Sequence, residues 1–352
     1  MTTYGDFIAR WNKQEGSVLE FEGEGYNMKA SDLDMATFAE KLAKNKKLTS
    51  LTLLRTRHTT NHATLLAAAL SKNTVLQSLK LRELQIMDDG IFALARALRT
   101  NKSLTSFEIS TSLGMTSAGM GTAGVKELCS ALKTSQSLKH LSLAHNQDGL
   151  TDAGVKGLGE LLGTNQSSLT SLDITDSNVG PAGIIALAQG LSTNTKLTAL
   201  CIDSGSGRAY KKMAFSSGKG LDSFAALCAA LVHNSTLASI NMLGIGVSQE
   251  AMPLLEAVLP MNDSLRELTV CARAPGADHR NPQAIIDRRR VMAKVRKPRT
   301  KSGLDTCEVP SAVMKWLEAW AGSSSVVAPD SSSSTKKRKR MTEVERLRAA
   351  NE

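Results

Sequence analysis

The sequence predicts an α/β solenoid, a horseshoe of stacked strand–helix units, and three observations support this prediction. A nine-residue phrase, Asn-x-x-Leu-x-x-Leu-x-Leu, recurs with variations eight times along the 352-residue chain. Each phrase is followed by a stretch with helical apolar spacing. Aromatic residues make up only 4% of the chain, so the core must be built from aliphatic side chains of similar size, as repetition would produce.

The phrases are spaced almost regularly. Successive first leucines are separated by 28, 28, 34, 31, 28, 40 and 28 residues. Four gaps of one length, with apolar residues kept at the leucine positions, indicate one repeated structural unit. The first leucines are Leu48, Leu76, Leu104, Leu138, Leu169, Leu197, Leu237 and Leu265.

Each unit reads as a strand followed by a helix. Leu51 and Leu53 stand two residues apart, the period of a strand with one buried face. Ile91, Leu94 and Leu98 have the spacing of one helix face. Neither element buries its apolar face alone, so neighbouring units must stack, with a parallel sheet along the inside of an arc and helices outside.

The phrases and their 28-residue spacing resemble the ribonuclease-inhibitor-like class of leucine-rich repeats over about residues 17–271. The resemblance implies a leucine-rich-repeat horseshoe with a full helix on its convex side. That class usually carries asparagine in the loop after the strand, and His145-Asn146 and Ser177-Asn178 approach this pattern here. Most units lack this loop asparagine, so the resemblance does not imply even curvature.

Charge and composition divide the chain into four parts. Residues 1–270 hold 25 Lys and Arg against 24 Asp and Glu, whereas residues 271–352 hold 18 against 9. The basic character therefore belongs to the C-terminal region. The expected parts are an N-terminal segment (1–16), the solenoid with an atypical first capping unit and about eight repeats (17–271), basic capping or docking helices (272–321), and a disordered Ser-rich linker with a basic tail (322–352).

Several function classes are disfavoured. No apolar run approaches the roughly 18 residues of a membrane span, and the first residues lack the pattern of a signal peptide. The five cysteines form no Cys-x-x-Cys motif, and their odd number argues against a disulfide framework or a structural zinc site. We therefore expect no membrane span and a reducing compartment.

Motifs of catalysis are also missing. The sequence contains no Gly-x-x-x-x-Gly-Lys-Ser/Thr, Gly-x-Ser-x-Gly or His-Glu-x-x-His motif. His58 and His62 have a possible metal spacing but no third ligand nearby. We expect no enzyme, no cofactor, no metal and no small-molecule substrate.

The concave face is the first candidate binding surface. Eight strands at about 4.8 Å give it a length of roughly 34 Å, which favours a macromolecular, protein partner over a small molecule. Its central row should hold Thr52, Lys80, Glu108, Ser142, Asp173, Cys201, Asn241 and Thr269. The candidate partner contacts on this face are Lys80, Arg82, Lys139 and His140, and a solvated sheet face is the alternative.

A loop edge is the second candidate. The three long gaps place their extra residues between strand and helix, near 111–121, 145–152 and 203–222, so these loops should project from one edge of the arc. The third loop interleaves cations and aromatics, which fits an acidic partner or nucleic acid. Its four Ser and four Gly within 203–220 equally fit a tolerated insertion. The candidate contacts in it are Arg208, Tyr210, Lys211 and Lys212.

The C-terminal region suggests two capping elements. Gln283 to Lys297 is predicted as a helix that covers the last repeat and presents its cations outward, where RNA or an anionic surface would bind. A second stretch carries an apolar stripe that we expect to dock on the end of the solenoid, with binding to a partner as the alternative. That stripe consists of Val313, Trp316, Leu317 and Trp320.

The tail carries a candidate nuclear address. A run of five cations follows the Ser-rich stretch, which is what the acidic groove of a nuclear import receptor reads in extended form. We therefore expect the nucleus, the cytoplasm or both as the location, and loose binding to RNA or anionic lipid is the alternative. The run is Lys336, Lys337, Arg338, Lys339 and Arg340.

A repeat surface without a reactive constellation favours a non-enzymatic protein–protein interaction scaffold that uses the concave face and one loop edge. Two resemblances give alternatives. The repeats are similar to those of Ran GTPase-activating proteins, which implies a catalytic arginine beside an early strand, as Arg55 and Arg57 are here; the acidic C-terminal tract of that family is replaced by a basic one. They also resemble the C-terminal domain of tropomodulin, which implies actin binding, although the helical N-terminal half of that family has no counterpart.

Overall fold

The computed structural model describes most of the repeated region. The described residues are 11, 16–22, 32–54, 59–111, 119–202, 218–247, 251–272, 285–287, 312–313 and 315. The strands are β1 (Val18–Glu22), β2 (Ser50–Leu54), β3 (Ser78–Leu84), β4 (Ser106–Thr111), β5 (His140–Ser142), β6 (Ser171–Asp173), β7 (Ala199–Cys201), β8 (Ser239–Val247), β9 (Glu267–Ala272) and β10 (Ile285–Asp287). The helices are α2 (Asp32–Lys44), α3 (Thr60–Leu70), α4 (Asp88–Thr100), α5 (Thr122–Leu132), α6 (Asp152–Thr164), α7 (Pro181–Thr193), α8 (Lys219–His233), α9 (Met252–Val258) and the short 3-10 helix η2 (Leu259–Met261).

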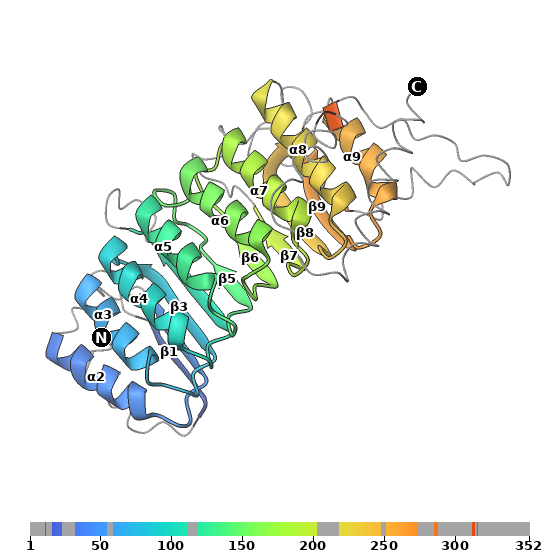
Figure 1. Cartoon of the computed structure of the whole chain (residues 1–352). Helices are drawn as coiled ribbons and strands as arrows, with labels where there is room; N and C mark the ends of the chain where they lie inside the picture. The colour runs from blue at the N-terminus through green and yellow to red at the C-terminus, as the bar shows by residue number, and fades with distance from the viewer. Residues whose placement is uncertain are drawn as a thin grey trace.

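Strands and helices alternate along a single layered arc (Figure 1). The strands follow one another in chain order from β1 to β10. Each of β1 to β8 pairs with the next strand in parallel, and the helices cover one face of this sheet (Figure 1). The predicted α/β solenoid is confirmed.

The leucines of the repeated phrase form the core. The first leucine of every phrase is at most 1% exposed, and it joins a single apolar cluster that continues from unit to unit. Each layer covers its neighbour, so the apolar faces of strand and helix are buried together. No helix in the described part of the chain is long and apolar enough to cross a membrane.

The first unit closes the N-terminal end of this core. β1 pairs with β2 from Val18 to Glu22, and α2 follows at the place expected for an atypical first helix. Trp11, which the sequence left unassigned, packs edge-on against Phe38 of α2 with ring centroids 5.0 Å apart. Both side chains are buried, so this aromatic pair covers the first layer.

The asparagine that begins the phrase has a structural role at the turn from helix to strand. The Asn101 side chain donates from Nδ2 to the backbone oxygens of Leu70 (2.7 Å) and Asn73 (3.0 Å). Its Oδ1 accepts from the backbone N–H groups of Ser103 (3.0 Å) and Leu104 (2.7 Å). The same four bonds recur at Asn73, Asn234 and Asn262.

These residues form an asparagine ladder along one edge of the solenoid, since each side chain joins its own turn to the preceding repeat. The ladder also satisfies carbonyl groups that a helix leaves unpaired at its C-terminus.

Two aspartates join helices at the opposite edge. Asp88 Oδ1 accepts from the backbone N–H groups of Gly121 (2.7 Å) and Gly124 (3.0 Å) at the start of α5. Asp152 makes the equivalent pair of bonds at the start of α7. A Cβ at Gly124 would lie 2.6 Å from Asp88 Oδ1, so glycine is required where the carboxylate approaches. Each carboxylate caps the N-terminus of the next helix.

The predicted helix from Gln283 is wrong at its start. Ile285–Asp287 forms β10, which pairs antiparallel with β9. The edge of β9 presents unpaired backbone groups that an added strand satisfies, and two successive isoleucines suit a strand. Residues 288–297 lie outside the described part of the chain.

Candidate partner-binding surface

The strand pairing places the expected central row of the concave face in one line. Thr52 pairs with Lys80, Lys80 with Glu108, and the row continues through the later strands to Thr269. The side chains from Lys80 to Thr269 are partly exposed, whereas Thr52 is only 5% exposed. The row therefore offers a continuous polar surface from β3 to β9.

Arg82 forms an ion pair within the sheet. Its guanidinium donates through Nε to Glu108 Oε1 and through Nη2 to Glu108 Oε2, the latter at 3.0 Å. The hydrogen bond to Glu108 raises the pKa of Arg82, with further help from the charges of Glu108 and Glu20, although partial burial acts in the opposite direction. The side chain remains 42% exposed, so Arg82 is both oriented by Glu108 and accessible.

The four basic candidates of the concave face do not form one cluster. Lys80 and Arg82 lie on β3, and His140 begins β5 with Lys139 directly before it, so β4 separates the two pairs. Lys139 and His140 are exposed, and Lys80 is half-buried. A partner that contacts all four must span at least these three strands.

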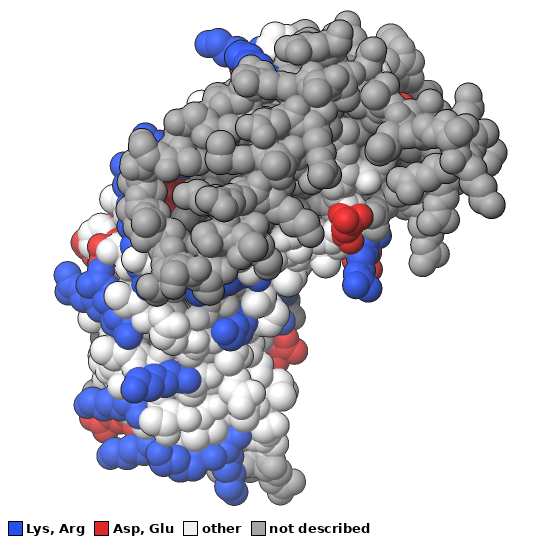
Figure 2. Space-filling model, turned by 45° about the vertical axis from the view of Figure 1, so that its right-hand side comes forward, with Lys and Arg blue, Asp and Glu red and all other residues white. Residues whose placement is uncertain are grey.

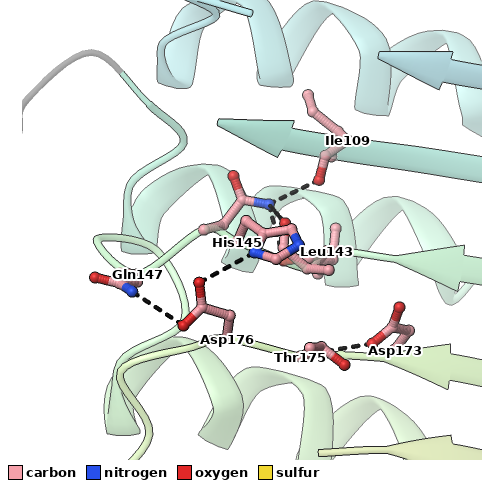
Figure 3. A network of polar contacts seen from close by, with 9 residues as sticks. Ile109, Leu143, His145, Gln147, Asp173, Thr175 and Asp176 are labelled. Atoms are coloured by element: carbon pink, nitrogen blue, oxygen red, sulfur yellow. Dashed lines mark hydrogen bonds and ion pairs between the residues drawn. The ribbon is translucent and has the colours of Figure 1, made fainter. Parts of the chain in front are cut away.

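A polar network occupies the middle of the row, and Figure 3 shows its contact between Thr175 and Asp173. Ser142 Oγ donates to Asp173 Oδ2 at 3.0 Å, and the backbone N–H of Thr175 donates to Asp173 Oδ1 at 2.9 Å. Thr175 Oγ1 in turn lies 3.0 Å from Cys201 Sγ. These contacts join β5, β6 and β7 and hold the Asp173 carboxylate in one orientation.

A second group lies where the strands end, on the strand-to-helix edge. Glu83, His145 and Asp176 have φ angles of 54°, 62° and 52°, and they occupy the same position of three repeats. Asp176 accepts from Gln147 Nε2 at 3.2 Å, and its other oxygen lies 3.0 Å from His145 Nδ1 (Figure 3). We call His145, Gln147 and Asp176 the rim group.

Sequence reasoning missed the rim group. The available signal was the position seven residues after the first leucine of the phrase, which holds Glu83, His145 and Asp176 in three repeats.

The loop asparagine is confirmed in one unit and wrong in the next. Asn146 is 1% exposed and donates from Nδ2 to the backbone oxygens of Ile109 (2.7 Å) and Leu143 (2.8 Å) (Figure 3). In the following unit Ser177 takes this buried position, and Asn178 instead forms an isolated bridge with Thr151. His145 and Asp176 both have positive φ angles, and the residues that follow them are Asn146 and Ser177. Ser177, and not Asn178, is therefore the structural equivalent of Asn146.

Several sequence candidates lie outside the described residues: Arg55, Arg57, Arg208, Tyr210, Lys211, Lys212, Trp316, Leu317, Trp320 and Lys336 to Arg340. Of the expected docking stripe, Val313 is fully buried in the core cluster. Near it, Lys315 Nζ donates to Asp222 Oδ1 of α8 at 3.3 Å. Docking of the remaining stripe stays a prediction.

The side chains with catalytic or metal-binding chemistry that the structure describes here, His62, Cys129 and Cys228, are buried within the fold. His62 is 2% exposed, and its Nδ1 accepts from the backbone N–H of Thr59 at the start of α3. Burial raises the pKa of the Cys129 thiol to about 12 and raises that of Cys228 still further. Within the described ranges, no three His, Cys, Asp or Glu side chains lie together as metal ligands would.

A family model described as "Leucine Rich repeat" matches residues 134–159 and 165–188, which include β5, β6 and the first parts of α6 and α7. The fold is a leucine-rich-repeat solenoid.

The chain is also 33% identical over 134 residues to NACHT, LRR and PYD domains-containing protein 5 of Homo sapiens, covering 38% of this chain and 11% of that protein. It is 32% identical over 183 residues to NACHT, LRR and PYD domains-containing protein 14 of Mus musculus. This match covers 45% of this chain and 18% of that protein. The leucine-rich-repeat chain thus spans less than a fifth of either relative.

Two solved structures resemble the solenoid. Leiomodin-1 Actin-Binding Site 2 aligns with a TM-score of 0.36 and 20% identity, covering 46% of this chain and 91% of that one. The tropomodulin C-terminal domain of Caenorhabditis elegans aligns with a TM-score of 0.37 and 17% identity, covering 50% and 92%.

Proposed function

We propose that the protein is a non-enzymatic interaction scaffold that binds another protein across its concave face, and that its repeats are of the ribonuclease-inhibitor-like class. The observation that supports binding is the unbroken row of partly exposed polar side chains from Lys80 to Thr269. An open surface of this length fits a macromolecule better than a small ligand. The neighbouring rim group extends it onto the strand-to-helix edge.

The order of charges on this surface defines the partner. Cations stand at β3 and at the start of β5, with Glu108 of β4 between them paired to Arg82, whereas the carboxylates of Asp173 and Asp176 stand at and just beyond β6. A complementary partner carries acidic groups opposite the first region and donors or cations opposite the second. Complementary charge of this kind sets the orientation of binding and the association rate more than the affinity.

The test is a comparison of captured partners between charge variants. Proteins captured by proximity labelling of the wild type are identified and then tested in pull-downs with Lys80→Glu/His140→Glu. The double variant should lose most of the binding to its concave-face partner, because both new carboxylates oppose the acidic side of that partner. Lys126→Glu is the control, since Lys126 is exposed on α5, on the helical side.

Unchanged binding of every captured protein to Lys80→Glu/His140→Glu would contradict the proposal. Equal loss with Lys126→Glu would do so as well.

The two alternatives are tested with the same preparations. A Ran-type regulator would accelerate GTP hydrolysis by its GTPase in the presence of the purified chain, and Arg55→Ala or Arg57→Ala would remove that effect. A tropomodulin-like protein would co-sediment with actin filaments. The absence of both effects, with concave-face binding present, supports the scaffold.

We also propose that Lys336 to Arg340 direct the protein to the nucleus through an import receptor. A fluorescent fusion in which these five cations are replaced by alanine should lose nuclear signal, because the fusion is too large for fast passive entry. An unchanged distribution would contradict this address and leave salt-dependent binding to RNA or anionic lipid as the role of the tail.

A further inference from the structure

The helix-to-strand edge of the first four repeats carries a row of exposed lysines. Figure 2 turns the right-hand side of Figure 1 forward, and the blue side chains there outnumber the red ones in its lower part, which holds the N-terminal repeats. We call this row the lysine edge. Its exposed members are Lys44, Lys46, Lys47, Lys72, Lys102 and Lys133.

The fold does not need these cations. Where the asparagine ladder runs, it already satisfies helix-end carbonyls at this edge, as the bond from Asn101 to the Leu70 oxygen shows. The residue after the ladder asparagine is Lys102 in one repeat but Thr74, Ser235 or Asp263 in the others. The same turn therefore forms with a neutral or acidic residue at this position.

Helix dipoles do not account for the row either. Cations near a helix C-terminus are stabilising, yet α6 and α7 end without a basic residue in the last turn. The concentration of lysines in the early repeats is thus a property of the surface and not of the repeat architecture.

Few acidic groups neutralise the row. The nearby carboxylate of Glu127 on α5 pairs with Arg99 of α4 at 2.8 Å, and Arg99 is not a member of the row. Among the residues that the structure describes, Lys46 Nζ has one hydrogen-bond partner, the hydroxyl of Thr74 at 3.4 Å. Lys47, Lys72 and Lys102 form no ion pair with any described residue. Their charges are available to an external anion.

We propose that the lysine edge binds an extended acidic segment of a partner protein. Successive repeats are separated by about 4.8 Å at their strands and by about 8–10 Å at their helices. These spacings bracket the roughly 6.8 Å between alternate side chains of an extended chain, so one extended segment could reach cations of successive repeats. An Asp- or Glu-rich segment lying along the edge would place one carboxylate near each repeat.

The side-chain chemistry favours an acidic polypeptide over nucleic acid. The row consists of lysines, which are point charges, whereas arginine is the side chain that matches phosphate in two-point contacts. Among the Phe, Tyr and Trp side chains whose burial the structure describes, four are buried and Phe92 of α4 is only partly exposed, so these offer the edge no platform on which bases would stack. This inference does not depend on the concave-face proposal, because it concerns a different surface.

The test is a fluorescence anisotropy titration of the full chain with a labelled peptide of about 20 residues that alternates Glu and Ser, at low ionic strength. Lys47→Gln/Lys72→Gln/Lys102→Gln removes three charges from the edge. Lys126→Gln/Lys156→Gln/Lys219→Gln removes three exposed charges from helices elsewhere and leaves the C-terminal region identical. The edge variant should bind about 10-fold more weakly than the wild type, and the control within about 2-fold.

Three results would overturn the proposal. The first is an absence of peptide binding by the wild-type chain. The second is an equal loss for both triple variants, which indicates summed charge and no specific edge. The third is an RNA duplex of similar charge whose binding depends on the edge more strongly than peptide binding does. Lys80→Glu/His140→Glu should bind the peptide like the wild type, so failure of the concave-face proposal is seen separately.

Discussion

Asn101 shows at the scale of one residue why the repeated phrase begins with asparagine. Its side chain makes four hydrogen bonds to buried backbone groups of two repeats. Sequence periodicity revealed the residue but not this role, because the bonds to Leu70 and Asn73 exist only once two repeats are stacked. The phrase thus predicted a repeat, and the structure supplies the reason for its first position.

Asn101→Ala should lower the free energy of unfolding by about 2–4 kcal/mol, since it leaves buried donors and acceptors without partners. Urea denaturation followed by circular dichroism measures this loss. Thr74→Ala is the control, because Thr74 is exposed in the equivalent turn and should change stability by less than about 0.5 kcal/mol. Equal stability of the two variants would show that the asparagine ladder does not stabilise the stack.

Ser135 is an interruption of the ladder. It occupies the position of Asn101 in the next repeat, is 2% exposed, and its Oγ has no hydrogen-bond partner among the described residues. Ser135→Asn should restore the missing bonds and raise the free energy of unfolding by about 1 kcal/mol, measured by the same denaturation. A loss of stability would mean that the turn at Ser135 is too tight for the amide, in contrast to its neighbours.

Cys129 and Cys228 should react only on unfolding. Burial raises the pKa of Cys129 to about 12 from the ordinary 9.0, so the folded thiol stays protonated at neutral pH. The unfolded thiol ionises at lower pH, and therefore the free energy of unfolding should fall as the pH rises above about 9, by up to about 1.4 kcal/mol per pH unit for one such thiol.

Mass spectrometry after brief alkylation at about pH 8 should show Cys129 and Cys228 unmodified in the folded chain and modified in urea. Rapid modification without urea would contradict their burial.

At the scale of elements, glycines set the closest helix contact. A Cβ at Gly190 of α7 would lie 2.0 Å from the backbone oxygen of Gly159 in α6, so the two helices touch through their backbones. A Cβ at Gly163 would meet Gly190 Cα at 3.5 Å, an ordinary contact. Neighbouring glycines of one interface thus have opposite tolerance for a methyl group.

Gly190→Ala should destabilise the protein by about 2 kcal/mol, because α6 and α7 must separate. Gly163→Ala should stabilise it by up to about 1 kcal/mol through helix propensity. Thermal melts of both variants test the pair. Similar melting temperatures would contradict the close backbone contact.

The alternation of elements was predictable because each spans enough residues to show its own period. The periods of leucine spacing predicted every repeat strand and its place in the row, since parallel stacking fixes the register once the repeats align. β10 was not predictable in this way. Its three residues, Ile285–Asp287, are too few to separate a strand from a helix start, and its formation depends on the free edge of β9, which is distant in the chain.

At the scale of the whole molecule, stacking changes what the charged candidates offer. Arg82 appeared as a free cation in the sequence, but Glu108 on the adjacent strand pairs with it. Such diagonal pairs depend on register, and the pattern of the strands contained that information. The rim group and the lysine edge were missed because each gathers residues from successive repeats that no local motif connects.

The central claim is that the concave row contacts a protein partner, and site-specific photo-crosslinking tests it most directly. A photoreactive amino acid is placed at Ser142 on the concave face and, separately, at Lys156 on α6, where the side chain is 67% exposed. The account predicts a crosslink to the captured partner from position 142 and none from position 156. Crosslinks from position 156 alone would place the partner on the convex side and contradict the account.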